Sequence, residues 1–119
     1  LVDAPNGSFQ NAILDGGESS EITVPVADGD TLKVYRWGAY QVSDGSTPSG
    51  LDMELLDGSD TVQVTENTGD TESTVASSPV ASYQNSSGSA SIFKIAIAND
   101  TGGTIADPGV GGFAAYLVE

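Results

Sequence analysis

Carboxylates gathered around glycines are the residues of this sequence with the clearest potential for chemistry. They occur in "VADGDTLKVY", "LLDGSDTVQVTE" and "ENTGDTES". A calcium ion takes six to eight oxygen ligands, usually from several carboxylates at fixed short offsets around a glycine. None of these turns has that spacing, since Asp28 and Asp30 flank a single glycine and Asp57 and Asp60 flank a Gly-Ser pair.

The same residues suit tight hairpin turns, because such turns need positive φ and an Asp side chain can accept hydrogen bonds from its own backbone. We therefore favour hairpin turns over cation sites and expect no bound metal. A composite calcium site remains an alternative if two loops meet at one end of the fold. Its first candidate ligands are Asp28, Asp30, Asp57 and Asp60.

The aromatic stretch "VYRWGAY" holds the candidate ligand or interface residues Tyr35, Arg36, Trp37 and Tyr40. In a regular strand Tyr35 and Trp37 share one face, where they could stack on a sugar ring while Arg36 or Lys33 supplies donors to its hydroxyls. Such residues also serve as core and interface, with Trp supplying buried area and Arg pairing with a carboxylate. We favour packing over sugar binding.

Most common catalytic machinery is excluded, because the chain has no Cys and no His. A disulfide framework, a thiolate or imidazole metal site and a Ser-His or Cys-His nucleophile are all impossible. Paired carboxylates could serve a glycosidase, but any acidic chain offers such pairs. We expect no enzyme and no cofactor. Glycosylation sequons at Asn6, Asn85 and Asn99 mildly favour an extracellular or virion surface.

The charge balance is extreme, because the sequence has 17 Asp and Glu but only three Lys and Arg, for a net charge of -14. Nucleic acid and anionic membranes are therefore not expected as partners. Two carboxylates ~10 Å apart in water repel by about 0.4 kcal/mol, and dozens of such pairs approach a typical stability of ~5–15 kcal/mol. Molar salt shortens the screening length to ~3 Å, so the composition suits brine and resembles that of proteins from extreme halophiles. The alternatives are an ordinary acidic surface protein and a disordered acidic tail.

Alternation of apolar and polar residues argues against the tail and predicts the elements that must position these side chains. Expected strands cover 8–14, 22–27, 31–43, 51–56, 61–65, 93–97 and 113–118, with an eighth near 80–84. Pro25 indicates an edge strand or a bulge, and Gly38 a bulge or bend. Residues 67–91 are expected to form a long polar surface loop. The prediction is a single all-β domain over 1–119, an antiparallel, jelly-roll-like β-sandwich of seven to eight strands.

The segments "ITVPVADGDTLKVYRWGAY", "GLDMELLDGSDTVQV", "IFKIAIAN" and "GGFAAYLVE" together resemble small β-sandwich structural proteins of tailed viruses that infect halophilic archaea. The resemblance covers nearly the whole chain in composition and strand order. It implies a non-enzymatic virion component, either a capsid decoration or turret subunit or a tail-associated part. Self-association and other virion proteins are the implied partners, and the virion surface is the implied location.

A second resemblance is to the jelly-roll domains that follow secreted peptidase domains, through "GLDMELLDG" and "FAAYLVE". It implies a carbohydrate- or calcium-binding accessory module, extracellular or at the cell surface, with Asp52 at the position of a calcium carboxylate. Edge strands near Pro25 and near Tyr116 carry few protecting charges, so we expect a homo-oligomer, with a trimer as the first expectation.

Overall fold

The structure is a computed structural model that describes residues 6–14, 19–41, 51–66, 78–99 and 105–119. In these ranges the chain is all-β, as predicted, and contains no helix that could cross a membrane. The strands are β1 (Asn6–Leu14), β2 (Ser19–Val26), β3 (Thr31–Gln41), β4 (Leu51–Leu56), β5 (Val62–Glu66), β6 (Ala81–Gln84), β7 (Ser91–Asn99) and β8 (Ile105–Val118). The expected eighth strand near 80–84 is therefore confirmed as β6.

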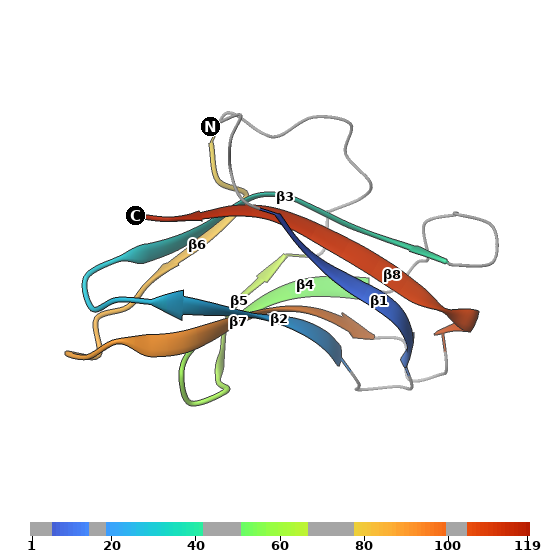
Figure 1. Ribbon diagram of the computed structural model, residues 1–119, viewed down its shortest axis with the longest axis horizontal. Coiled ribbons are helices and arrows are strands. Elements are labelled where there is room, and N and C mark those ends of the chain that lie inside the picture. Colours follow the sequence, from blue (N-terminus) through green and yellow to red (C-terminus); the bar gives the residue numbers. More distant parts are fainter. Residues whose placement is uncertain (1–5, 15–18, 42–50, 67–77, 100–104) are drawn as a thin grey trace.

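The strands form two antiparallel sheets, which Figure 1 shows as two layers. One sheet has the order β1-β8-β3-β6 and the other β2-β7-β4-β5. Consecutive strands β1, β2, β3 and β4 alternate between the sheets, so the chain crosses from one layer to the other at each of these connections. The β4–β5 connection is the first that joins neighbours within a sheet.

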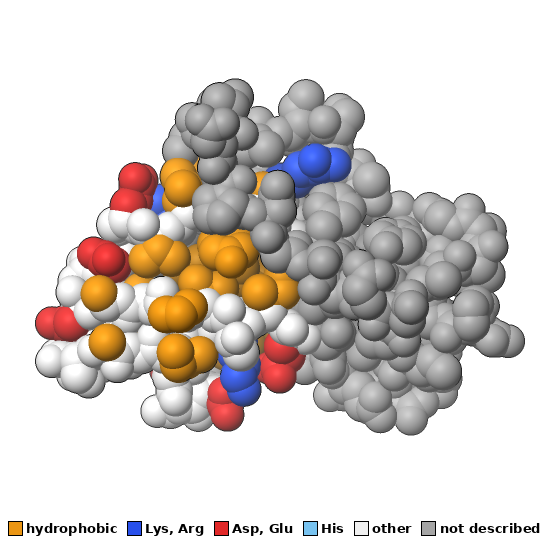
Figure 2. Space-filling model, in the orientation of Figure 1, with side chains coloured by type: hydrophobic (Ala, Val, Ile, Leu, Met, Phe, Trp, Pro, Cys, Tyr) orange, Lys and Arg blue, Asp and Glu red, His pale blue; other side chains and the backbone are white. Residues whose placement is uncertain are grey.

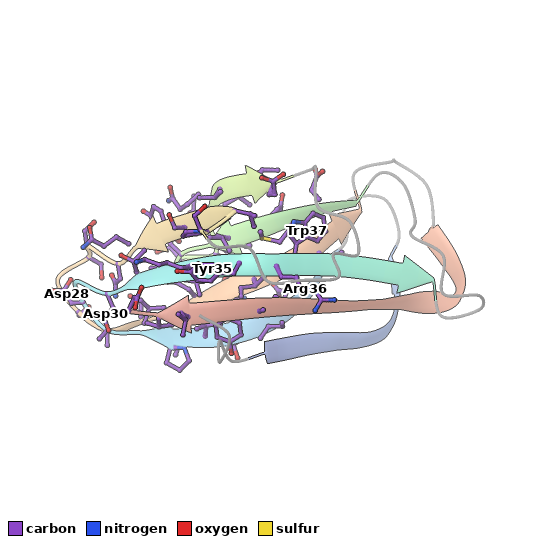
Figure 3. The ribbon with its side chains drawn as sticks, turned by 90° about the horizontal axis from the view of Figure 1, so that it is seen from above. Asp28, Asp30, Tyr35, Arg36 and Trp37 are labelled. Carbon is purple, nitrogen blue, oxygen red and sulfur yellow. The ribbon has the colours of Figure 1, made fainter. Side chains whose placement is uncertain are left out.

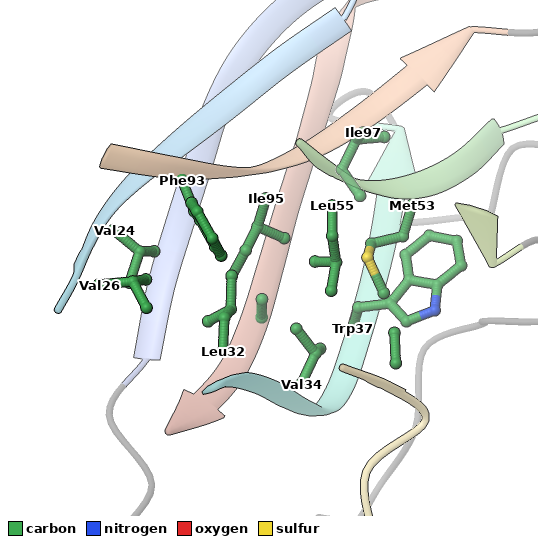
Figure 4. Close-up of a cluster of buried hydrophobic side chains, with 12 residues drawn as sticks. Val24, Val26, Leu32, Val34, Trp37, Met53, Leu55, Phe93, Ile95 and Ile97 are labelled. Atoms are coloured by element: carbon green, nitrogen blue, oxygen red, sulfur yellow. The ribbon is translucent and has the colours of Figure 1, made fainter. Parts of the chain in front are cut away.

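One hydrophobic core fills the space between the layers. Strand alternation aims every second side chain of each sheet at the other sheet, and Figure 4 shows these side chains meeting. The core members come from both sheets: Val24, Val26, Leu32, Val34, Trp37, Met53, Leu55, Ala81, Phe93, Ile95, Ile97 and Ala114. The predicted apolar faces of the strands at 22–27, 51–56 and 93–97 are thus the buried ones.

The side-chain alternation of β3 is interrupted at Tyr35. Its register against β8 shifts between Val34 and Arg36, whereas Gly38 pairs with Phe113 in regular register. The expectation of a bulge at Gly38 is therefore wrong, and the irregularity lies three residues earlier. Because the extra residue reverses the alternation, Trp37 joins Leu32 and Val34 in the core.

The edges of the sheets agree only in part with the sequence. Strand β2 pairs with β7 alone and is an edge strand, as Pro25 predicted. The strand that contains Tyr116 is not an edge, because β8 lies between β1 and β3. It also begins earlier than expected, and Pro108 falls in the stretch where its register with β1 is irregular, the place where a sheet tolerates proline.

The expected polar loop over 67–91 is wrong for its second half. Residues 81–84 form β6, and 85–90 form a short connection to β7. The first half, 67–77, lies outside the described residues.

Candidate functional site

Three connections lie close together, two of them at the left end of Figure 1 and the third below β7. They are the turn 27–30 between β2 and β3, the turn 57–61 between β4 and β5, and the connection 85–90 between β6 and β7. We call this region the loop end. Two of the three connections join strands of different sheets, so the loop end closes the core between the layers.

Asn85 holds the loop end together. Its side chain is 2% exposed, and Nδ2 donates to the carbonyl oxygens of Val26 (2.9 Å) and Ser89 (2.8 Å). Its Oδ1 accepts from the backbone N–H (3.1 Å) and the hydroxyl (2.7 Å) of Ser87. Its main chain also bonds the turn 27–30. The Asn85 carbonyl accepts the N–H of Gly29 (2.7 Å), and the Asn85 N–H donates to the carbonyl of Asp30 (2.8 Å). A buried polar side chain needs such partners, and here they fix two loops against each other.

This role of Asn85 was missed by the sequence analysis, which noted the residue only as a glycosylation sequon. Both hydrogens of the amide are engaged and the side chain is buried, so the folded chain cannot carry a glycan there. The side chains of Asn6 and Asn99 lie outside the part of the structure that describes side chains.

The acidic turn at Asp28 and Asp30 is a tight turn but not a hairpin. Asp30 N–H donates to the Ala27 carbonyl at 3.0 Å, and Gly29 has φ of 88°, as Asp-Gly turns require. The flanking strands β2 and β3 belong to different sheets, so the predicted hairpin is wrong here. The Asp28 carboxylate instead accepts the N–H of Gly88 at 2.9 Å and ties the turn to the third connection.

The acidic turn at Asp57 and Asp60 is the predicted hairpin, since β4 pairs with β5. Asp57 Oδ1 accepts the N–H groups of Ser59 (2.8 Å) and Thr61 (3.1 Å), and Oδ2 accepts Gln63 Nε2 (2.8 Å). These bonds, first from Gln63 and then from the two backbone groups, lower the pKa of Asp57 because they favour its charged form. Asp60 takes the left-handed conformation (φ 62°) and its carboxylate lies 2.7 Å from Lys94 Nζ.

Three of the four carboxylates proposed as composite calcium ligands are therefore directed at different partners. Asp57 caps its own turn, Asp60 pairs with Lys94, and Asp28 binds the backbone of Gly88. Among the described residues, no three acidic side chains come together as a metal would require.

The aromatic candidates on β3 lie away from the loop end, as Figure 3 shows for Tyr35, Arg36 and Trp37 against Asp28 and Asp30. Trp37 is 2% exposed and belongs to the core, and Tyr35 is 4% exposed. The sugar-stacking platform is thus contradicted, because the bulge places Trp37 on the core face and burial leaves neither ring open to a ligand. Packing, the favoured alternative, is confirmed for both rings. Arg36 is half-buried, and the side chain of Tyr40 lies outside the description.

A pocket of about 290 Å³ opens at the loop end, between the Asp57 turn and the connection from β6 to β7. We call it the loop-end pocket. Its lining is Asp57, Gly58, Ser59, Tyr83, Gln84, Asn85, Ser86, Ser87, Ser89, Ser91 and Phe93. The rings of Tyr83 and Phe93 pack at 5.6 Å with a 41° tilt. No family model, curated protein or solved structure matches this chain significantly.

Proposed function

We propose that this chain is a non-enzymatic jelly-roll subunit of a virion adapted to high salt, a capsid decoration, turret or tail-associated part. The observation that carries the proposal is the set of strand pairs β1–β8, β2–β7, β3–β6 and β4–β5, all antiparallel. These are the pairs of one long hairpin rolled into two sheets. Eight-stranded jelly rolls have such pairs, and they occur in viral capsid domains, lectin domains and cupins.

An edge suited to assembly supports the proposal. Strand β2 has a partner on one side only, and Glu21 at its start is its one charged residue. Opposite its Pro25 lies Ile92, which is 51% exposed. Figure 2 shows hydrophobic side chains gathered on the face where β2 lies. Natural proteins cover or charge such edges, and a second copy of the chain would cover this one.

The charges support the high-salt part of the proposal. Two lysines form ion pairs. Lys33 Nζ lies 2.9 Å from a carboxylate oxygen of Glu119, and Lys94 Nζ lies 2.7 Å from Asp60 and 3.8 Å from Glu21. Both described lysines are thus paired, and the sequence has only three Lys and Arg to offset the charge of 17 Asp and Glu. Salt would screen the repulsion among these acidic groups.

Sedimentation velocity in about 3 M KCl tests the assembly. We expect a mass that is a multiple of the single chain, with a trimer as the first expectation. Ile92→Lys should weaken association by about tenfold or more, because it buries an ammonium group at the contact. Ser82→Lys changes the charge equally on an exposed position of β6 and should leave association unchanged. A chain that remains monomeric at high protein concentration contradicts the self-association on which the proposal depends.

A further inference from the structure

We infer that the loop-end pocket binds one neutral, polyhydroxylated ring, such as a single sugar residue. The inference does not depend on assembly, because it concerns the loop end of one chain. A volume of about 290 Å³ lies at the small end of the range for ligand pockets, which is roughly 300–1,000 Å³, so the pocket suits one ring.

The polar groups of the pocket match sugar hydroxyls in kind. Five serines line it, namely Ser59, Ser86, Ser87, Ser89 and Ser91. A serine hydroxyl can both donate and accept, although that of Ser87 already donates within the loop, to Asn85 Oδ1 and the Ser89 carbonyl. Asp57 adds a fixed acceptor. Of its roughly four lone-pair positions, Oδ1 uses two for Ser59 and Thr61 and Oδ2 uses one for Gln63. One position on Oδ2 remains to receive a hydroxyl.

The charge of the pocket disfavours anions and metal ions. Neither Lys nor Arg is among its lining residues, and Asp57 is the only acidic one. A phosphate, sulfate or carboxylate group would meet a carboxylate without a compensating cation. A metal ion would find one carboxylate that already accepts three hydrogen bonds, far from the oxygen set that calcium requires. A neutral polar ligand meets neither obstacle.

The pocket also offers an apolar surface and rigid walls. The half-buried Tyr83, braced by Phe93, can pack against the C–H face of a ring. Asn85 fixes one wall by its four side-chain hydrogen bonds. At the other wall the backbone approaches closely, since a Cβ at Gly58 would lie 3.0 Å from Ser91 Cβ. A preformed pocket of this kind saves the free energy of ordering on binding.

Titration of the ¹⁵N-labelled chain with methyl glycosides of glucose, galactose and mannose and with N-acetylglucosamine, in about 3 M KCl, tests the inference. At least one probe should shift the amide signals of Ser59 and of residues 86–91 saturably, and leave those of β3 unchanged. Ser86→Trp should fill the pocket and lower affinity by about tenfold or more. Ser82→Trp, exposed on β6 and absent from the lining, should bind as the parent does.

Three results would overturn the inference: no saturable shift with any probe, binding that persists in Ser86→Trp, or the same shifts produced by calcium chloride alone. The melting temperature of each variant checks that it is folded. If Ser86→Trp does not fold, the affinity of Ser59→Ala for the same probe tests the site instead. This variant removes a lining hydroxyl, while the backbone N–H of residue 59 still donates to Asp57. Unchanged affinity in a folded Ser59→Ala then counts against the site.

Discussion

Asn85 is the residue on which the loop end depends most. Replacing it with Ala removes the donors to the carbonyls of Val26 and Ser89 and the acceptor for Ser87 N–H. Because unsatisfied buried polar groups are costly, we expect Asn85→Ala to lower the free energy of unfolding by about 2–3 kcal/mol. Urea unfolding at fixed KCl concentration measures this loss.

The neighbouring Gln84 provides the matched control. Its amide also donates to a backbone carbonyl, that of Gly29 at 2.9 Å, but the contact is exposed. Gln84→Ala should therefore cost less than about 1 kcal/mol. Equal losses in the two variants would contradict the role assigned to Asn85. The sequence could not predict that role, because the bond to Val26 spans 59 residues of chain.

At the scale of elements, strand positions could be predicted from the sequence better than strand partners. Period-two alternation located β2, β4, β5, β7 and the second half of β8, because a half-buried strand must alternate. Strands β1, β3 and β6 were expected without that signal. The face of Trp37 was missed, since nothing in "VYRWGAY" marks Tyr35 as the extra residue of a bulge. Similarly, "ADGD" and "LDGSD" look alike as turns, yet only the second joins neighbours in one sheet. That difference depends on long-range pairing, which local residues do not encode.

The β4–β5 hairpin carries a prediction about pH. The pKa of Asp57 is lowered, so its bonds stabilise the fold above the usual aspartate range and are lost as pH falls through the lowered pKa. Gln63→Ala removes the largest cause, and we expect the pKa of Asp57 to rise toward the usual value. Titration of the Asp57 carboxyl carbon by NMR measures the change.

Thr65→Ala is the control for that titration, because Thr65 is exposed on the same strand as Gln63 and is not among the three groups that donate to the Asp57 carboxylate. It should leave the pKa of Asp57 where it is. A titration midpoint that does not move in Gln63→Ala would show that the Gln63 contact does not hold the carboxylate.

For the whole molecule, net charge dominates the expected response to solvent. We expect the melting temperature to climb between about 0.1 M and about 3 M KCl, because screening weakens repulsion among the carboxylates. NaCl should act like KCl. Millimolar calcium should add little beyond its ionic strength, since the described acidic groups form no cluster of three.

Two substitutions separate general screening from a specific calcium effect. If calcium bound at the loop end, it would raise the melting temperature at fixed ionic strength, and Asp28→Asn or Asp57→Asn would abolish the increment. We expect no such increment in the parent chain. A calcium-specific rise of several degrees in the melting temperature, lost in either variant, would instead support the composite calcium site that the geometry disfavours.

The pairing of β1 with β8 joins the first described strand to the last. During synthesis, β1 must wait for its partner until residues 105–118 have been made, at a pace of roughly 5–20 residues per second. Pairings of such long sequence separation also fold slowly once they become possible. Unfinished chains therefore expose apolar strand edges for seconds, and mutual repulsion among their carboxylates would keep neighbouring nascent chains from joining those edges in the wrong way.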